Sequence, residues 1–186
     1  SKRDFTRVTK PLKLFGADFI SKNKGLPLTI VGSEFLRPIK YNEKLGSAQC
    51  KSSVMFAALK TPGITKIKAK KSRNHTELLF KFLNIPIKLI KKQNFDYIDI
   101  KGISNFGAFK YTVPGDISSC SFFIVLTLMT KNSKIIIKNV NTNKTRTGIV
   151  SILKKMNANI IFKNKRIYNG EEVSDILVES TAYLTG

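Results

Sequence analysis

Residues 47–59 read SAQCKSSVMFAAL, and residues 72–83 read SRNHTELLFKFL. Each segment opens with a small polar residue and continues with apolar residues at helical spacing, which predicts two helices with a strand between them at 65–69. A helix start offers backbone N–H groups without helical acceptors and the positive end of the helix dipole. The hydroxyl, amide and guanidinium groups at these two starts therefore predict a site for an anion such as phosphate.

The same arrangement returns later in the chain. At an offset of 71 positions, and without a gap, Ser47-Ala48 falls on Ser118-Ser119 and Phe82 falls on Leu153. Both copies predict the order helix, strand, helix, strand, strand, and a third, partial copy precedes them at residues 11–32. We therefore expect an α+β fold built from repeated units of two helices with mixed parallel and antiparallel strands.

Local patterns give the expected limits of these elements. The expected helices cover residues 3–16, 47–60, 72–83, 118–129 and 145–156. The expected strands cover residues 26–32, 65–69, 85–91, 95–101, 134–140, 158–163 and 176–179. Between the two repeats, Val113-Pro114-Gly115-Asp116 combines the two residues that most strongly interrupt regular structure, so we expect a domain boundary or hinge there.

Length and cysteine content limit the class of protein. With 186 residues, 42% of them hydrophobic, the chain suits one ordinary domain or two small ones. The longest apolar stretch, residues 122–129, is too short to span a bilayer, so no membrane partner is expected. Cys50 and Cys120 lie in apolar helix patterns far from other ligands, which predicts buried free thiols, no metal site and a cytoplasmic setting. Since the chain begins without Met, we also expect a piece of something longer.

The formal net charge of +21 allows two interpretations. Strong basicity is typical of a nucleic-acid-binding module, because neutralising phosphates drives that association. Here, however, the excess is mostly Lys, it is spread along the chain, and it accompanies abundant Asn and Ile, residues that share A/T-rich codons. Aromatic residues do not alternate with Arg in a stacking pattern, and Trp is absent. We therefore interpret the charge as compositional bias and expect no nucleic-acid partner.

Several segments together resemble, in order and spacing, the 3-phosphoshikimate 1-carboxyvinyltransferase (EPSP synthase) family. They are Ser47-Ala48-Gln49-Cys50-Lys51-Ser52, Thr61-Pro62-Gly63-Ile64-Thr65, Ser72-Arg73-Asn74-His75-Thr76-Glu77, Val113-Pro114-Gly115-Asp116-Ile117-Ser118-Ser119 and Asn143-Lys144-Thr145-Arg146-Thr147-Gly148. The first and third look most like the bacterial class II enzymes, often described as glyphosate-tolerant. The resemblance covers essentially the whole chain, but this chain would be less than half of a family member.

The resemblance implies the enolpyruvyl transferase fold, with six repeats in two globular domains joined by a hinge. Residues 1–113 would then form the later part of one domain, and residues 114–186 the hinge and the first repeat of the other. The implied reaction transfers the enolpyruvyl group of phosphoenolpyruvate to the 5-hydroxyl of shikimate 3-phosphate in chorismate and aromatic amino acid biosynthesis. It implies no cofactor, no metal and, for the full-length chain, a monomer.

The resemblance also implies roles for particular residues. Ser47, the Ala48 backbone N–H and Arg73 would hold the phosphate of shikimate 3-phosphate. Gln49 would reach both substrates, and Arg3 would pair with phosphoenolpyruvate. Two positions depart from the family pattern: Asp4-Phe5 stand where Pro-Met usually follows Arg3, and Asn74 replaces an Asp, where we expect it still to cap its helix.

Other polar residues are expected to be structural. His75 lies at a helix start, Asp116 suits a hinge or a helix cap, and Arg146-Thr147 echoes His75-Thr76 through repeat architecture. The resemblance places the general base and acid in a later part of the family sequence, so no catalytic residue is assigned here and the chain alone is expected to be inactive.

Two other enzymes with related folds are alternatives to this family. One is the sister enzyme that transfers enolpyruvate to UDP-N-acetylglucosamine, and the other is the RNA 3′-phosphate cyclase built on related repeats. The sister enzyme uses a catalytic Cys in a loop of its early domain. Neither Cys50 nor Cys120 lies in a suitable loop.

Overall fold

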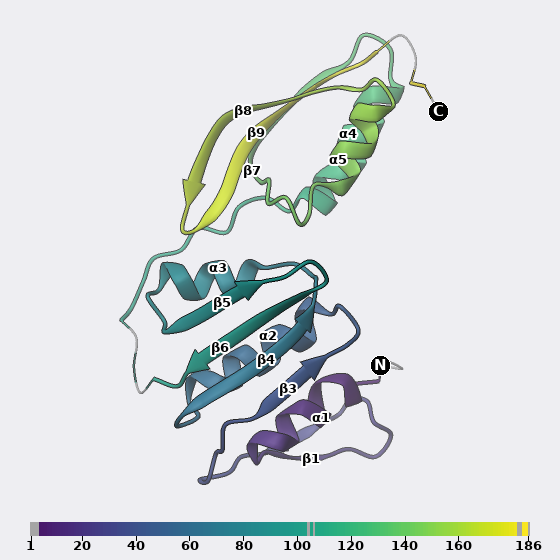
Figure 1. The fold of residues 1–186 in the computed structure, drawn as a ribbon. Helices are drawn as coiled ribbons and strands as arrows, with labels where there is room; N and C mark the ends of the chain where they lie inside the picture. Colours follow the sequence, from purple (N-terminus) through teal and green to yellow (C-terminus); the bar gives the residue numbers. More distant parts are fainter. Residues whose placement is uncertain (1–3, 104, 106, 182–183, 186) are drawn as a thin grey trace. The chain divides into compact units, whose positions relative to one another are not determined.

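The computed structural model describes residues 4–103, 105, 107–181 and 184–185. The chain divides into two compact units, Ser1–Ala108 and Phe109–Gly186 (Figure 1). Each unit has its own hydrophobic core. Arg3, one of the two residues predicted to contact phosphoenolpyruvate, lies outside the described residues.

The first unit combines helices with a mixed sheet. Its helices are α1 (Thr6–Phe15), α2 (Ala48–Leu59) and α3 (His75–Phe82). Its strands are β1 (Asp18–Ile20), β2 (Thr29–Val31), β3 (Lys40–Glu43), β4 (Ile64–Lys70), β5 (Ile87–Lys91) and β6 (Phe95–Lys101). Strands β1 and β2 form a small antiparallel pair. The main sheet has the order β3-β4-β6-β5, with β3 parallel to β4 and the other pairs antiparallel, which confirms the expected mixture.

The core of the first unit lies on one face of this main sheet. Side chains alternate along each strand, so every second residue of β4 and β6 points into the core while the residues between them point out. Helix α2 packs against both strands, and α1 packs against α2. Each fully buried aliphatic side chain contributes about 1.5–3 kcal/mol. The buried residues include Phe15, Val54, Met55, Ala58, Ile67, Ala69, Phe80, Ile98 and Ile100.

The second unit repeats the order of elements. It contains α4 (Ile117–Met129), β7 (Lys134–Asn141), α5 (Gly148–Lys155), β8 (Asn159–Tyr168) and β9 (Glu171–Glu179), with an antiparallel sheet in the order β7-β9-β8. Both helices contribute to one core with this sheet (Figure 1). The β8–β9 hairpin is longer than predicted, because Asn169 and Gly170, both at positive φ, form a tight turn between the strands.

The predicted gapless offset of 71 is wrong, although the predicted order of elements is confirmed. The first residues of equivalent elements differ by 69 for α2 and α4, 70 for β4 and β7, 73 for α3 and α5, 72 for β5 and β8, and 76 for β6 and β9. An offset of 70 aligns buried Cys50 with Cys120 and buried Val54 with Ile124. The spacing between equivalent elements therefore differs through the lengths of loops and of the second hairpin. Within α2 and α4, these two aligned positions are buried in both helices.

Helix starts and short strands account for the remaining differences. Helices α3 and α5 each begin three residues later than predicted, because residues 72–74 and 145–147 lie in the preceding loops. Asn74 occupies the position before α3, but its side chain makes no cap hydrogen bond, so the capping prediction is wrong. The expected strand at residues 26–32 is ordered as a strand only over Thr29–Val31.

From Phe122 to Met129, helix α4 carries apolar side chains on all sides, with Thr127 the one polar residue. One side, which includes Ile124 and Leu128, is buried against the sheet. On the other side, Phe122, Leu126 and Met129 are 76%, 63% and 75% exposed. We call these three residues the outer face of α4. A helix that is hydrophobic all round is typical of a protein interior, so this face is unusual at a surface.

Candidate functional site

The start of α2 is held in place by the carboxylate that ends β3. Glu43 is 1% exposed, and its oxygens accept hydrogen bonds from the backbone N–H groups of Leu45, Gly46 and Ser47 at 2.8–3.1 Å. The Ser47 Oγ then caps the helix by accepting from the Cys50 N–H at 3.3 Å. The predicted helix cap is therefore confirmed. The hydroxyl can still donate its proton to a ligand, because the cap uses only its acceptor.

The first turn of α2 also leaves backbone donors for a ligand. The N–H groups of Ala48 and Gln49 have no acceptor four residues earlier within the helix. Both residues are at least partly exposed. These donors lie at the positive end of the α2 dipole, where an anion is favoured.

Gln49 has a partner that sequence reasoning missed. The Arg7 Nη2, from α1, donates to the Gln49 Oε1 at 3.1 Å. Arginine can only donate, so the amide oxygen of Gln49 must face Arg7 and its NH₂ group is left to donate elsewhere. Arg7 therefore brings a second guanidinium to the site and sets which end of Gln49 a ligand meets. No local pattern indicates this contact, because the two residues lie 42 positions apart in the chain.

Arg73 lies in the loop between β4 and α3, and it is exposed. Its backbone carbonyl accepts from the Lys51 Nζ at 2.9 Å, which brings this loop to the first turns of α2. Within the described part of the chain, the Arg73 guanidinium has neither a hydrogen bond nor an ion pair. A planar, permanently charged fork is thus left free for a phosphate or carboxylate.

Two further contacts join α2 to α3 beneath these residues. The Lys51 Nζ forms an ion pair with the Glu77 Oε1 at 2.5 Å, and their side chains are 1% and 2% exposed. The Ser52 Oγ and Thr76 Oγ1 are 2.6 Å apart and share a hydrogen bond. The helix start at Ser47 and the loop at Arg73 are therefore connected through the protein interior.

The arrangement in the first unit has the chemistry of an anion-binding site. It combines free guanidinium charge, a hydroxyl, an amide and backbone N–H groups, all of which can donate hydrogen bonds. The neighbouring carboxylates are already engaged, Glu43 by three N–H groups and Glu77 by Lys51. The structure thus brings together Ser47, Ala48 and Gln49 on one helix start.

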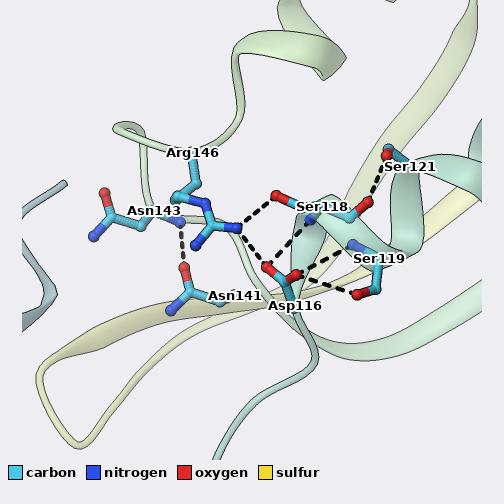
Figure 2. A network of polar contacts seen from close by, with 7 residues as sticks. All are labelled: Asp116, Ser118, Ser119, Ser121, Asn141, Asn143 and Arg146. Atoms are coloured by element: carbon cyan, nitrogen blue, oxygen red, sulfur yellow. Dashed lines mark hydrogen bonds and ion pairs between the residues drawn. The ribbon is translucent and has the colours of Figure 1, made fainter. Parts of the chain in front are cut away.

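The second unit contains a related helix start with a different outcome (Figure 2). Asp116 caps α4, because its carboxylate accepts from the N–H groups of Ser118 and Ser119 at 3.2 and 3.3 Å. The Arg146 Nη2 donates to the Asp116 Oδ1 at 2.6 Å and to the Ser118 Oγ at 2.5 Å. At the offset of 73 that relates α3 to α5, Arg146 corresponds to Arg73 and not to His75, and its guanidinium is neutralised within the protein.

The surroundings of Asp116 favour its charged form. Partial burial acts to raise the pKa of this carboxyl, but the Ser118 N–H and the charge of Arg146 outweigh it, so the pKa is lowered below its ordinary value. Asp116 caps its helix, which the sequence predicts as one of two roles, and it also pairs with Arg146, which the sequence does not predict. Asn143 completes the local network by donating its N–H to the Asn141 Oδ1 at 3.0 Å (Figure 2).

Metal and thiol chemistry find no support in the residues that the structure describes. Among them, no group of three or more His, Cys, Asp or Glu side chains is placed to hold a metal ion. Cys50 and Cys120 are free and buried, as predicted, and burial raises the pKa of the Cys120 thiol. No helix in this described part has the length and apolar character needed to cross a membrane.

Known proteins resemble this chain closely in sequence. The sequence model of the family described as EPSP synthase (3-phosphoshikimate 1-carboxyvinyltransferase) matches residues 1–185. The 3-phosphoshikimate 1-carboxyvinyltransferase of Petrotoga mobilis is 42% identical over 185 residues, which cover 97% of this chain and 42% of the relative. The enzyme of the same name from Caldicellulosiruptor saccharolyticus is 44% identical over 183 residues, with the same coverage.

Solved structures agree with these relatives. The EPSP synthase of Acinetobacter baumannii matches with a TM-score of 0.80 and 34% sequence identity, covering 96% of this chain and 40% of that one. The mixed α+β fold is therefore shared with a solved enzyme. This chain spans only about two fifths of the length of the relatives that it matches.

Proposed function

Because this chain belongs to the EPSP synthase family, we propose that it forms part of a 3-phosphoshikimate 1-carboxyvinyltransferase. That enzyme transfers the enolpyruvyl group of phosphoenolpyruvate to the 5-hydroxyl of shikimate 3-phosphate and releases phosphate. Both substrates are anions, and the first unit offers uncompensated donors at a helix start. In this proposal the first unit binds substrate, and the remaining catalytic groups come from the part of the family chain that this one does not span.

Four residues would hold shikimate 3-phosphate. The Ser47 hydroxyl, the Ala48 N–H and the Arg73 guanidinium would bind its phosphate, and the Gln49 amide would contact both substrates. Arg3, outside the described residues, would pair with phosphoenolpyruvate. A charge-assisted hydrogen bond contributes about 1.5–3 kcal/mol, so several of them together suit a substrate bound at micromolar concentration.

One observation carries the proposal more than any other. Within the described residues the Arg73 guanidinium is free, whereas the Arg146 guanidinium is occupied by Asp116. The free guanidinium supports an anionic ligand for the first unit in particular.

The wider context of the enzyme belongs to the same proposal. Residues 1–113 would form the later part of one globular domain, and residues 114–186 the hinge and the first repeat of the other. The complete enzyme would act in the cytoplasm as a monomer, without a nucleic-acid or membrane partner and without a cofactor. Its product would enter aromatic amino acid biosynthesis.

Calorimetry with two ligands tests the proposed substrate. The chain should bind shikimate 3-phosphate and show at least tenfold weaker affinity for UDP-N-acetylglucosamine, because the donors at Ser47 and Arg73 suit a phosphate monoester. Tighter binding of the UDP-sugar would instead favour the sister enolpyruvyl transferase. Tight, steeply salt-dependent binding of duplex or single-stranded nucleic acid in a gel shift would favour the basic binding module.

Turnover provides a second test. Since the chain spans about two fifths of its relatives, we expect no phosphate release when it is mixed alone with shikimate 3-phosphate and phosphoenolpyruvate. The full-length Petrotoga mobilis relative, assayed in parallel, is the positive control. Measurable phosphate release by the isolated chain would refute the proposal that its catalytic groups lie elsewhere.

A further inference from the structure

The buried ion pair between Lys51 and Glu77 lies directly behind the candidate site. Lys51 belongs to the second turn of α2, and Glu77 belongs to the first turn of α3. Their charged atoms are 2.5 Å apart, and neither side chain is more than 2% exposed. Lysine and glutamate are rarely buried so completely, so this pair calls for an explanation.

Stability alone does not explain the pair. Removing two charges from water costs about as much as their attraction returns, and buried pairs can often be replaced by apolar residues without loss. A lysine in the core therefore gains most of its value from a contact that an apolar side chain cannot make. Lys51 has such a contact, because its Nζ also donates to the Arg73 carbonyl at 2.9 Å.

The Lys51–Arg73 hydrogen bond fixes a backbone whose side chain has no anchor of its own. The Arg73 guanidinium has no partner among the described residues, so its position depends on the loop that carries it. Lys51 lies one helical turn after Ser47, on the helix whose start offers the other donors. The ammonium group of Lys51 therefore connects the two halves of the site through the interior.

A second contact restrains the same junction. The Ser52–Thr76 hydrogen bond, 2.6 Å long, also joins α2 to the beginning of α3. Glu77 orients the Lys51 side chain, because its carboxylate lies 2.5 Å from the Lys51 Nζ in a region closed to water. Lys51 can then direct another N–H bond toward the Arg73 carbonyl, since an ammonium group has three donors.

We propose that Lys51 and Glu77 are positioning residues that hold Arg73 at a fixed distance from the α2 start, so that one phosphate group meets both. Neither residue touches the ligand, since both are buried. The inference rests on the proposed function for its ligand, but the restraint on the Arg73 loop can be measured without any ligand.

The test compares the wild-type chain with the double variant Lys51→Met, Glu77→Leu. This variant removes both charges together, so no charge is left buried and unpaired, and the fold is expected to persist. The single variant Lys51→Met would strand Glu77 and is less informative. Should the apolar pair fail to fold, Lys51→Gln with Glu77→Gln removes the same charges with polar replacements. Lys88→Met, an exposed lysine on β5, is the matched control for charge.

Two measurements are made on each protein. Hydrogen exchange reports the protection of the backbone amides of Lys71 and Leu78, which donate hydrogen bonds at the two ends of the segment 71–78 that carries Arg73, and calorimetry reports the affinity for shikimate 3-phosphate. We expect faster exchange in this segment and about tenfold weaker binding in the double variant, at a nearly unchanged melting temperature. Lys88→Met should match the wild type in both measurements.

The two measurements separate failure of this inference from failure of the proposed function. Unchanged exchange at Lys71 and Leu78 together with unchanged affinity would overturn the positioning role. Absence of shikimate 3-phosphate binding by the wild-type chain would count against the proposed function instead. In that case exchange alone decides, with faster exchange supporting the restraint and unchanged exchange overturning it.

Discussion

The starts of α2 and α4 occupy equivalent places in two repeats, yet a positive charge stays unpaired near the first and is neutralised at the second. At α2 the cap is Ser47, and the nearby Arg73 guanidinium has no partner in the described chain. At α4 the cap is Asp116, and the Arg146 guanidinium pairs with that carboxylate. A serine cap satisfies a helix start without adding charge, so a positive site remains for a ligand. An aspartate cap supplies the anion from within the protein.

The largest expected effect separates the two arginines. Arg73→Ala should weaken binding of shikimate 3-phosphate by about one to two orders of magnitude, because it removes a charge-assisted hydrogen bond. Arg146→Ala removes the same charge from the second unit, where the guanidinium already has a partner, and should change affinity less than about threefold. Calorimetry on both variants measures the difference. Equal losses would mean that the helix starts do not differ as described.

Exchanging the caps should reverse the comparison. Ser47→Asp places a carboxylate where the ligand phosphate would lie, so we expect about tenfold weaker binding from like-charge repulsion while the helix stays capped. The matched variant Asp116→Ser should free Arg146 and give the second unit a weak new affinity for inorganic phosphate. Phosphate titration followed by NMR can detect both changes. A Ser47→Asp chain that binds as well as the wild type would contradict the role of Ser47.

Arg7 offers a smaller effect that concerns the orientation of Gln49. Arg7→Met frees the Gln49 amide to rotate, so we expect about three- to fivefold weaker binding of shikimate 3-phosphate. Arg7→Lys keeps a donor toward the Gln49 oxygen and should recover most of the affinity. Lys10→Met removes a charge from the exposed side of the same helix and serves as the control. If Lys10→Met and Arg7→Met had equal effects, charge and not orientation would be responsible.

The smallest expected effect is the change in the stability of the second unit with pH. The pKa of Asp116 is lowered in the folded protein, so its contribution to stability is present above the ordinary value of 3.8 and is lost as pH falls through the folded value. Since this side chain is half exposed, the contribution should stay below about 1 kcal/mol. Urea unfolding of wild type and Asp116→Asn between about pH 7 and 3 measures it. The two curves should converge at the acid end, and parallel curves would contradict the ion pair.

Local sequence signals predicted most of the fold. The Ser47 cap, the apolar periodicity of residues 48–59 and the alternation along residues 64–70 are each fixed within a few neighbouring residues, so they could be read directly. The spacing of the repeats could not, because loops accept insertions at little cost. The dipeptide Asn169-Gly170 is a hairpin signal, and the last two strands continue to it, beyond the limits predicted from their apolar residues.

The candidate site was less accessible to sequence reasoning. Ser47, Gln49 and Arg73 could be named because they belong to short segments with their own helix-start chemistry. Arg7 could not, since its contact with Gln49 joins residues far apart in the chain. Lys51 looks like an ordinary solvated lysine until Glu77 is placed beside it. Tertiary pairing of this kind leaves no local pattern.

The outer face of α4 has a consequence for how copies of this chain behave in solution. This face exposes three large hydrophobic side chains, Phe122, Leu126 and Met129. Exposed hydrophobic surface promotes association between molecules. The net charge of +21 opposes this through mutual repulsion. Salt shortens the reach of that repulsion from about 10 Å at 0.1 M to about 3 Å at 1 M. The excess of lysine, whatever its origin, thus keeps molecules of this chain apart in solution. Purification at high ionic strength would screen this repulsion and allow the chains to associate.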